Sequence, residues 1–399
     1  MIHFRLVAIL MIKFIYQLMQ KHFFKYLSVL LLIQILSCTK EEIKKEENPA
    51  ETGPEISASM DGPYVFYENG GIKSYTVDAG GKLVSADVSY DDELKVVVPY
   101  RDPEVFDFIL KKELPEPKSV FDDGNKIFAV SDIEGNYYAL TKLLIGNGVV
   151  DKDLNWIYGK NHLVFNGDMV DRGKHVTQVL WLMYKLDHQS RKAGGHVHFI
   201  LGNHDVMCMA GDSRYAQDKY LQMADKLNIE YKELYGEKSE IGRWMRSKNA
   251  IEKINGYIFV HAGISSDILD LHLSMEQMND LMRPYYGIRI TDEVPADVYK
   301  LFKTSGILWY RGYEKSKEGA YPKATVDLVD NTLDRFNAKK VIVGHCLMDE
   351  IETRYGGKVI MMDVHNPDSK TSSHEFQALL IEENKVYRVD EKEKKISLN

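Results

Sequence analysis

Short apolar runs that end on polar residues recur along the middle of the chain. Residues 127–130, 163–165 and 197–201 are mainly apolar and have the length of buried strands. Between these runs, apolar residues repeat at helical spacing at 140–144 and 179–183. The separation of about 35 residues from the end of one run to the next fits a strand, a crossover helix and a second strand. The pattern therefore predicts an α/β fold with parallel strands.

Residues 60–118 follow a different pattern. Short alternating runs such as 64–67 and 94–98 are separated by turns rich in Gly, Asn and Asp. We predict a small strand-rich segment here and find no candidate chemistry in it. The proline-containing stretch 113–117 ends this pattern, and we assign residues 119–399 to the main domain.

The first 37 residues are unlike the rest of the chain. Residues 26–37 form an apolar run behind two lysines, and the run is too short to cross a bilayer as a stable helix. Such a run is typical of a signal peptide, so we predict that residues 1–37 are a secretion signal. The alternative is a retained membrane-anchor helix, with Cys38 as an ordinary buried thiol. A start at Met19 instead of Met1 would give a signal of more usual size.

The predicted signal ends on the residues Ile-Leu-Ser-Cys at 35–38, which resemble the lipobox of bacterial lipoproteins. The resemblance implies that Cys38 carries a lipid and that the protein is an outer-membrane lipoprotein of the bacterial cell envelope. Residues 38–59 are charged and lack periodicity, so we predict a solvated tether. Cys208 and Cys346 are the other two cysteines, and the sequence leaves open whether they pair.

Net charge argues against one class of partner. The chain carries 51 Lys+Arg against 59 Asp+Glu, a formal net charge of -8. The predicted signal contains four basic residues and no acid, so its removal leaves -12. A chain this acidic is poorly suited to hold polyanionic nucleic acid by releasing counterions. We therefore expect no nucleic-acid partner.

Polar residues follow five apolar runs at the points where strands should end. Asp132, Asp168 and Asn203 offer oxygen atoms, while His261 and His345 offer imidazole nitrogen. Because the C-terminal ends of parallel strands meet at one edge of a sheet, the side chains of Asp132, Asp168 and Asn203 should converge, and the two histidines follow further apolar runs of the same kind. A mixed oxygen and nitrogen set suits Mn, Fe, Zn or Mg. If Asp168 bridges two cations at roughly 3.5 to 4 Å, the pair would produce a nucleophilic hydroxide and clamp a phosphoryl group.

This ordered set resembles the calcineurin-like metallophosphoesterases, from about residue 127 to residue 363. The Val-Asp-Arg-Gly ending of the second motif is typical of the phosphoprotein-phosphatase branch. Three further segments, 211–215, 242–249 and 308–313, resemble the bacterial Shewanella-like protein phosphatases. The matching motifs are Ser131-Asp132-Ile133-Glu134-Gly135, Gly167-Asp168-Met169-Val170-Asp171-Arg172-Gly173, Gly202-Asn203-His204-Asp205, His261-Ala262-Gly263 and Gly344-His345.

The resemblance implies a fold of two packed mixed β-sheets flanked by helices. It also implies a phosphomonoesterase of the protein-phosphatase type that uses two divalent metal ions, Mn before Fe, Zn or Mg. The metal ligands that it implies are Asp132, Glu134 and Asp168 for one ion, and Asp168, Asn203, His261 and His345 for the other.

The same resemblance assigns four residues to catalysis and substrate binding. It implies that His204 protonates the leaving alkoxide and that Asp171 holds this imidazole. A poor leaving group requires a general acid, and an imidazolium oriented by a carboxylate supplies one near neutral pH. Arg172 and Arg311 would bind the phosphate oxygens through their planar guanidinium groups.

Glu134 departs from the family pattern, which has His at this position. Glutamate can coordinate a metal, but its charge favours harder cations and makes bound water less acidic. Two other functions therefore stay open. One is a nucleotide or dinucleotide-polyphosphate hydrolase on the same fold, against which the segments around Arg214 and Trp309 weigh. The other is a non-catalytic lipoprotein that binds phosphate or a partner, against which the intact acid and phosphate-binding residues weigh. The sequence identifies neither the phosphorylated substrate, protein or small molecule, nor the oligomeric state.

Overall fold

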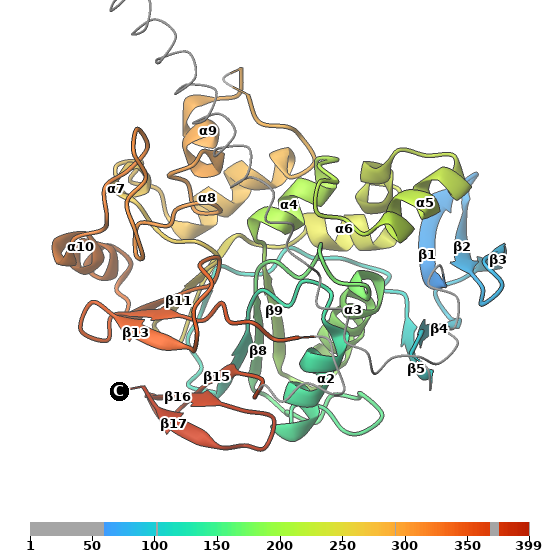
Figure 1. Ribbon diagram of the computed structural model, residues 1–399, viewed down its shortest axis with the longest axis horizontal. Coiled ribbons are helices and arrows are strands. Elements are labelled where there is room, and N and C mark those ends of the chain that lie inside the picture. The colour runs from blue at the N-terminus through green and yellow to red at the C-terminus, as the bar shows by residue number, and fades with distance from the viewer. Residues whose placement is uncertain (1–59, 101–102, 292, 368–374, 399) are drawn as a thin grey trace, which may run out of the picture. The chain divides into compact units, whose positions relative to one another are not determined.

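Two six-stranded sheets form the centre of the computed structural model, which describes residues 60–100, 103–291, 293–367 and 375–398 (Figure 1). The strand order is β17-β16-β15-β7-β8-β9 in the first sheet and β13-β14-β12-β11-β10-β6 in the second. Both sheets mix parallel and antiparallel pairs, so the predicted fold of two mixed sheets is confirmed. The first sheet comprises β7 (Ile127–Val130), β8 (His162–Asn166), β9 (His196–Ile200), β15 (Ala378–Glu382), β16 (Lys385–Val389) and β17 (Lys395–Ser397). The second comprises β6 (Val120–Phe121), β10 (Ile251–Ile254), β11 (Tyr257–Val260), β12 (Lys340–Val343), β13 (Glu352–Arg354) and β14 (Val359–Met361).

The central strands are buried on both faces. Along β7, Ile127 and Ala129 belong to an apolar cluster shared with the second sheet, whereas Phe128 and Val130 belong to the cluster that the helices cover. Successive side chains of a strand point to opposite faces, so a strand covered on both faces is apolar at every position. This arrangement explains why the sequence shows continuous apolar runs rather than alternation.

Helices flank the sheets and connect the strands (Figure 1). The longest, α3 (Val176–Ala193), contacts β9 and is buried along most of its length. It ends at Gly194, whose left-handed conformation (φ 77°) terminates the helix. The positive charges of Arg191 and Lys192 in the last turn interact favourably with the negative end of the helix dipole. The other helices are α2 (Tyr137–Gly146), α4 (Asn203–Met209), α5 (Asp218–Leu227), α6 (Glu240–Arg246), α7 (Ser266–Leu269), α8 (Met275–Met282), α9 (Ala296–Phe302) and α10 (Val326–Phe336), with short 3-10 turns at Tyr231–Tyr235 and Arg283–Tyr285.

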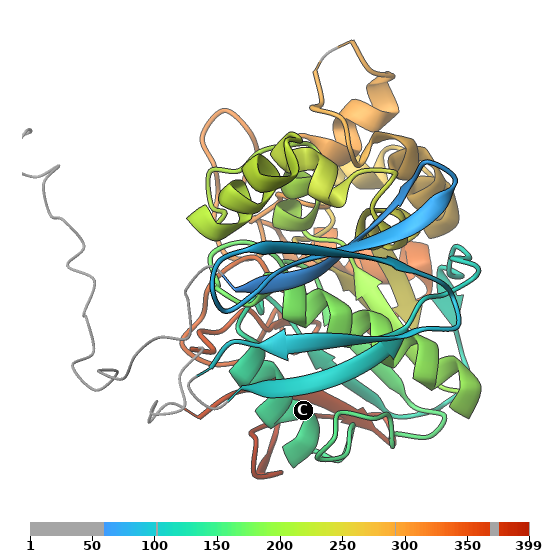
Figure 2. The ribbon, with the colours of Figure 1, turned by 90° about the vertical axis from the view of Figure 1, so that its right-hand side faces the viewer.

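The N-terminal strands pack on the same core. Figure 2 shows these blue and cyan strands lying across the face of the molecule in front of the green helix α3. Phe108 stacks on Trp181 of α3 with ring centroids 4.0 Å apart, so the segment shares its apolar core with the main domain. Its elements are the antiparallel sheet β1 (Asp61–Glu68), β2 (Gly71–Val77) and β3 (Leu83–Val88), and the hairpin β4 (Glu93–Val98) and β5 (Glu104–Ile109).

A buried chain of polar side chains joins the two sheets. His162 on β8 contacts His198 on β9, with Nδ1 and Nε2 2.9 Å apart. His198 in turn contacts Glu252 on β10 of the second sheet at 2.6 Å, and the outer nitrogen of His162 contacts Asp123 at 2.9 Å. Because His162, His198 and Glu252 are almost fully buried, this chain satisfies polar groups that would otherwise be costly inside the core.

Residues 1–59, which include the predicted signal peptide, tether and Cys38, lie outside the described residues. Within the part of the chain that the structure describes, no helix has the length and hydrophobicity needed to span a bilayer.

Candidate metal-binding active site

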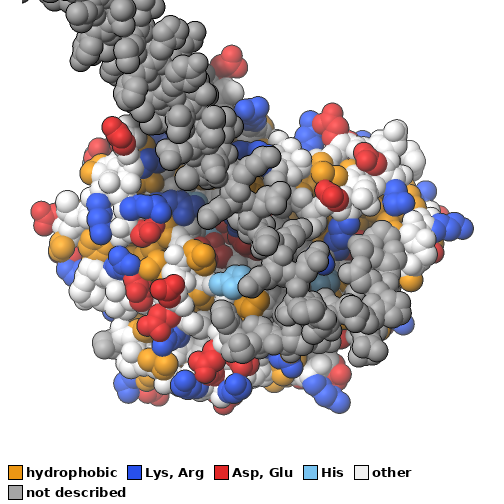
Figure 3. Space-filling model, viewed as in Figure 1, with side chains coloured by type: hydrophobic (Ala, Val, Ile, Leu, Met, Phe, Trp, Pro, Cys, Tyr) orange, Lys and Arg blue, Asp and Glu red, His pale blue; other side chains and the backbone are white. Residues whose placement is uncertain are grey.

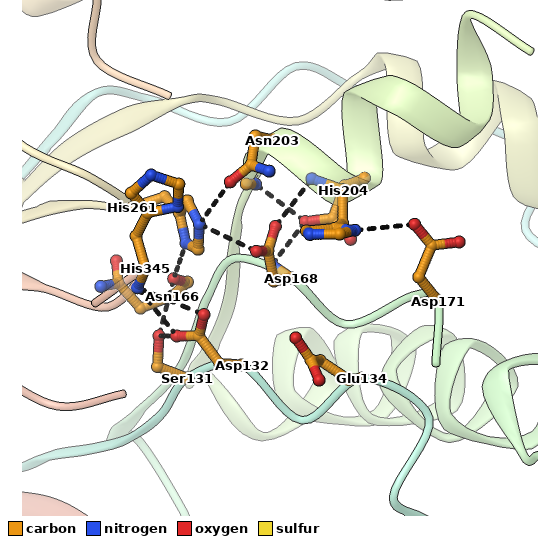
Figure 4. A network of polar contacts seen from close by, with 12 residues as sticks. Ser131, Asp132, Glu134, Asn166, Asp168, Asp171, Asn203, His204, His261 and His345 are labelled. Carbon is orange, nitrogen blue, oxygen red and sulfur yellow. Dashed lines mark hydrogen bonds and ion pairs between the residues drawn. The ribbon is translucent and has the colours of Figure 1, made fainter. Parts of the chain in front are cut away.

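The five strand-end residues converge, three of them from the first sheet as their spacing predicts and two from the second sheet (Figure 4). Asp132 and Asp168 follow β7 and β8 of the first sheet, and Asn203 begins α4 directly after β9. His261 and His345 follow β11 and β12 of the second sheet. The cluster is therefore built from both sheets, and Asp168, His261 and His345 can each place one ligand atom within 4.8 Å of the others.

His261 is held in an orientation suited to metal binding. Its Nδ1 donates a hydrogen bond to the backbone carbonyl of Asn166 at 3.0 Å. That bond directs Nε2 toward Asp168 Oδ2 and Asn203 Oδ1, both 3.1 Å away. A ring nitrogen fixed by a bond through its partner nitrogen is the usual arrangement of a ligating histidine.

The local charges fit a cation between these residues. When no cation is bound, burial raises the pKa of Asp132, and repulsion from Asp363 raises it further. Burial lowers the pKa of His261, but the carboxylates of Asp168 and Asp132 outweigh it and raise this pKa to about 10. Protonation thus compensates a concentration of buried negative charge, a role that a divalent cation would take over.

His345 adds a second indication. Burial, together with His261 and Arg311, holds the pKa of His345 well below its usual value, so its ring is neutral. Its Nε2 is buried and has no hydrogen-bond partner among the described residues. Buried polar atoms are rarely left unpaired, so an orphaned imidazole nitrogen beside Asp168 fits a missing ligand.

His204 lies beside the cluster and is oriented by a carboxylate, as the family resemblance implies. Its Nδ1 contacts Asp171 Oδ2 at 2.7 Å, and its backbone N–H donates to Asp168 Oδ1 at 2.8 Å. Its Nε2 faces Arg172 Nη2 at 3.2 Å. Tyr215 packs against the same imidazole with ring centroids 4.9 Å apart, and 43% of Tyr215 is exposed. Because a guanidinium only donates, Nε2 of His204 accepts from Arg172 in this arrangement, so the free nitrogen of the imidazole meets the guanidinium predicted to bind phosphate.

The side chain of Glu134 contacts both a possible metal-ligand group and the predicted phosphate-binding residue Arg172. It shares a possible metal-ligand group with Asp168 and His204, whose ligand atoms lie within 4.8 Å of one another. Its Oε1 also forms an ion pair with Arg172 Nη1. No local sequence pattern predicts this contact with Arg172.

Arg311 approaches the cluster from the side of the second sheet. Its Nη1 donates to the backbone carbonyl of His345 at 2.6 Å and lies 3.8 Å from the sulfur of Cys346. Cys346 and Cys208 are both buried free thiols.

The site reaches the protein surface only slightly. Histidine side chains are visible near the centre of the face drawn in Figure 3. Among the histidines of the site, His204 and His345 each have an exposed fraction of 5%.

The backbone around the site is held in an uncommon conformation. Six of the predicted site residues have positive φ angles between 49° and 70°. Residues other than glycine rarely adopt this region, and such strain collects at functional sites because the surrounding fold enforces it. The six residues are Asp132, Glu134, Asp168, Asp171, Arg172 and His345.

Two glycines allow the ligands to approach one another. A Cβ added at Gly167 would lie 2.3 Å from His261 Nδ1, and one at Gly202 would lie 2.2 Å from Asp168 Oδ1. Both distances are far below van der Waals contact. The glycines of these motifs therefore make room for the side chains of the site rather than serving only as turns.

Sequence reasoning missed two acids that belong to the site. Asp205 accepts backbone N–H bonds from Gly202, Asp168 and Met169 at 2.8 to 3.0 Å and so fixes the loop that carries Asp168. Asp363 follows β14, and burial raises its pKa to about 6. Its position after a short apolar run is the same signal that identified Asp132, so the pattern contained this residue.

Comparison with known proteins agrees with the geometry. The family model of calcineurin-like phosphoesterases matches residues 125–347, more than half of the chain. The crystal structure of a cold-active protein-tyrosine phosphatase from a psychrophilic Shewanella species is 32% identical, with a TM-score of 0.75, and the match covers 85% of this chain and 99% of that one. The Plasmodium berghei protein named Shewanella-like protein phosphatase 1 is 26% identical, over 55% of this chain and 60% of that protein.

A plant relative covers less. Shewanella-like protein phosphatase 2 of Arabidopsis thaliana is 27% identical over 35% of each protein. The chain thus spans less than two thirds of the length of these two named relatives, but nearly all of the solved Shewanella structure. The chain belongs to the calcineurin-like phosphoesterases, within which it is a phosphatase of the Shewanella-like type that hydrolyses phosphoesters.

Proposed function

We propose that the protein is a phosphomonoesterase that acts on phosphoproteins with two divalent cations in the site. The observation that carries this proposal is the arrangement of His204, Asp171 and Arg172 beside the cluster centred on Asp168. When bound, two cations would supply a water-derived nucleophile and neutralise charge on the phosphoryl group. The ligands would be Asp132, Glu134, Asp168, Asn203, His261 and His345.

The chain's own residues account for the remaining steps. Asp171 fixes the ring of His204 through Nδ1, which leaves Nε2 to donate a proton to the departing oxygen. Arg172 stands next to this nitrogen, so a phosphate held by Arg172 would present its leaving group to His204. Arg311 would bind the phosphate from the opposite side, near His345.

The exposed ring of Tyr215 favours an aromatic leaving group. It packs against His204 and lies under the guanidinium of Arg172, 5.3 Å from the ring centroid. A tyrosyl ring leaving toward His204 would therefore meet an aromatic surface. The solved Shewanella relative is named a protein-tyrosine phosphatase, which supports phosphotyrosine as the substrate of this chain.

We favour Mn in the two sites. The ligand set combines carboxylate and amide oxygen with neutral imidazole, and the extra carboxylate of Glu134 moves the preference toward harder cations. Fe, Zn and Mg are the alternatives that metal analysis of the purified protein would distinguish.

The test of function is a substrate panel. The purified protein with added Mn should hydrolyse phosphotyrosine peptides and other phosphomonoesters, and phosphodiesters and dinucleotide polyphosphates only weakly. Tyr215→Ala should raise KM for phosphotyrosine peptides more than for phosphoserine peptides, while Tyr299→Ala, which removes an exposed tyrosine on α9 away from the cluster, should change neither. Preferential hydrolysis of dinucleotide polyphosphates would support the nucleotide hydrolase, and metal binding without turnover would support a non-catalytic binding protein.

The lipid anchor is a separate proposal. It rests on the signal-like run and the lipobox resemblance at residues 35–38, which lie outside the described residues. We propose that the acylated Cys38 and the charged tether hold the phosphatase at the bacterial outer membrane.

A further inference from the structure

A partly open cavity bordered by cationic side chains lies away from the catalytic cluster. Its volume is about 260 Å³, and it lies between the segment after β5, the C-terminal half of α3 and the region of α6. The side chains that border it include four cations, Lys111, Lys112, Arg191 and Lys248, but only two carboxylates, Asp187 and Glu113.

Three of these cations share a single carboxylate. Asp187 Oδ2 accepts from Lys111 Nζ at 2.7 Å and from Lys248 Nζ at 3.0 Å, and its Oδ1 accepts from Arg191 Nε at 2.9 Å. The indole N–H of Trp244 also donates to Oδ2, at 2.8 Å. The carboxylate is therefore saturated with donors and cannot neutralise all three positive charges.

The surplus charge is buried. The side chains of Lys111 and Lys248 are only 7% and 4% exposed. Each ammonium has three N–H donors, yet among the described residues each has Asp187 as its only hydrogen-bond acceptor. Cation–π interactions stabilise part of this charge, because the ammonium of Lys111 lies 4.3 Å from the Tyr184 ring centroid and that of Lys248 lies 4.8 Å from the Trp244 ring centroid.

The pKa values of the two lysines are shifted in the direction that this imbalance predicts. Burial lowers the pKa of Lys111 to about 7, and the nearby Lys248 counteracts the attraction of Asp187. Burial likewise lowers the pKa of Lys248 despite its contact with Asp187. Buried ion pairs are stable only when their charges are balanced and their hydrogen bonds are formed. Without a further anion, this cluster keeps unbalanced positive charge and unused N–H donors.

We propose that this cavity is a binding site for a small ligand that carries a phosphate group. A phosphate dianion would accept the free donors of Lys111, Lys248 and Arg191, and its negative charge would favour the protonated form of both lysines. The volume is near the lower end of ligand pockets, which fits a small phosphorylated molecule or inorganic phosphate.

The site is distinct from the catalytic one. The N-terminal end of α3 adjoins the catalytic site, because the backbone N–H of His175 donates to the carbonyl of Gly135 in the first site motif. Asp187 is eleven residues beyond the start of α3, about 17 Å along the helix axis at 1.5 Å per residue. None of the residues that border the cavity belongs to the predicted metal or phosphate-binding set.

Two tryptophans allow phosphate binding at the two sites to be followed separately in one experiment. The indole N–H of Trp244 donates to Asp187 in the cavity, whereas Trp309 lies 6.0 Å from His345, measured between ring centroids. The protein would be loaded with Mg in place of the favoured Mn, because paramagnetic Mn broadens the resonances. Its indole nitrogens, labelled with ¹⁵N and assigned by Trp→Phe substitution, would be followed while inorganic phosphate is added. We expect a saturable shift of the Trp244 resonance with a midpoint different from that of Trp309.

Substitutions on one helix provide the matched comparison. Arg191→Gln should weaken the phosphate response of Trp244 by about tenfold, because it removes a charged donor. Lys192→Gln removes the same charge from the next exposed position of α3, which does not border the cavity, and should leave the response unchanged. Arg172→Gln should weaken the Trp309 response only.

Three outcomes would overturn the proposal. The first is a Trp244 resonance that stays fixed when phosphate saturates Trp309, and the second is equal weakening by Arg191→Gln and Lys192→Gln. The third is a Trp244 response that disappears with Arg172→Gln, which would show that the signal comes from the catalytic site. Since Arg191 is exposed, its variant should fold, and the decisive comparison does not require altering a buried lysine.

Discussion

Replacing His204 with asparagine tests the general acid directly. The imidazole is 5% exposed, its Nδ1 is held 2.7 Å from Asp171, and its Nε2 faces Arg172 at 3.2 Å. Asparagine can keep a hydrogen bond to Asp171 but has no acid to offer at Nε2. Loss of a positioned general acid costs about 10² to 10⁴ in rate, or about 3 to 5 kcal/mol in the activation barrier.

The size of this loss should depend on the leaving group. A phosphoserine peptide releases a poor alkoxide leaving group and should show the full decrease in kcat. A nitrophenyl phosphate releases a stable phenolate that needs no proton, so its kcat should fall by much less. Asp171→Asn should weaken the orientation of the ring and give an intermediate loss with the same dependence on the leaving group.

The assay combines kcat for both substrates with the metal content of each variant. Wild-type metal content together with a large difference between the two substrates would support the assignment. An equal decrease for both substrates, or loss of metal along with activity, would show that His204 is a ligand or a structural residue, and the reasoning from its geometry would be wrong.

Three other predictions follow from the same geometry and sequence. Glu134→Ala should lower the occupancy of one of the two metal sites. Glu134→His should restore this occupancy and move the acidic limb of the rate profile to lower pH, because a negatively charged ligand is replaced by a neutral one. Wild-type occupancy in the alanine variant would mean that Glu134 only holds Arg172. Burial and the neighbouring His198 lower the pKa of His162 to about 4, so the unfolded state takes up a proton first as the pH falls from about 6.5 to about 4. Up to roughly 3 kcal/mol of the free energy of unfolding should be lost over this range. Urea denaturation of His162→Gln should show a weaker pH dependence than that of the wild type, and an unchanged pH dependence would contradict this. Cys38→Ala in a bacterial host should abolish labelling by fatty acid, and unchanged labelling would place the lipid elsewhere.

The sequence revealed those parts of the site that follow regular strands. Asp132 and Asp168 follow apolar runs that form the neighbouring parallel strands β7 and β8, and the convergence of parallel strand ends predicts that they meet. His261 and His345 follow apolar runs as well, but they reach the site from the second sheet, which the runs alone do not reveal. Asp363 carries the same signal more weakly, because β14 has only three residues. A residue that follows a very short strand therefore carries a weaker sequence signal than one that follows a longer strand.

Other features depend on contacts between segments that no local pattern encodes. The ion pair of Glu134 with Arg172 arises because two strained loops meet after folding. The hydrogen bonds of Asp205 reach a loop 36 residues earlier in the chain, and the stacking of Phe108 on Trp181 joins the N-terminal strands to α3. Alternation of apolar residues predicts that such strands exist but not which helix they cover.

The origin of the ligands in two different sheets gives metal binding a mechanical role. Asp132 and Asp168 belong to one sheet and His261 and His345 to the other, so a cation bound between them would cross-link the two halves of the core. Its binding energy would then oppose separation of the sheets, and resistance to unfolding would rise with the free metal concentration. A phosphatase built in this way would lose activity and rigidity together when metal becomes scarce, and regain both when it returns.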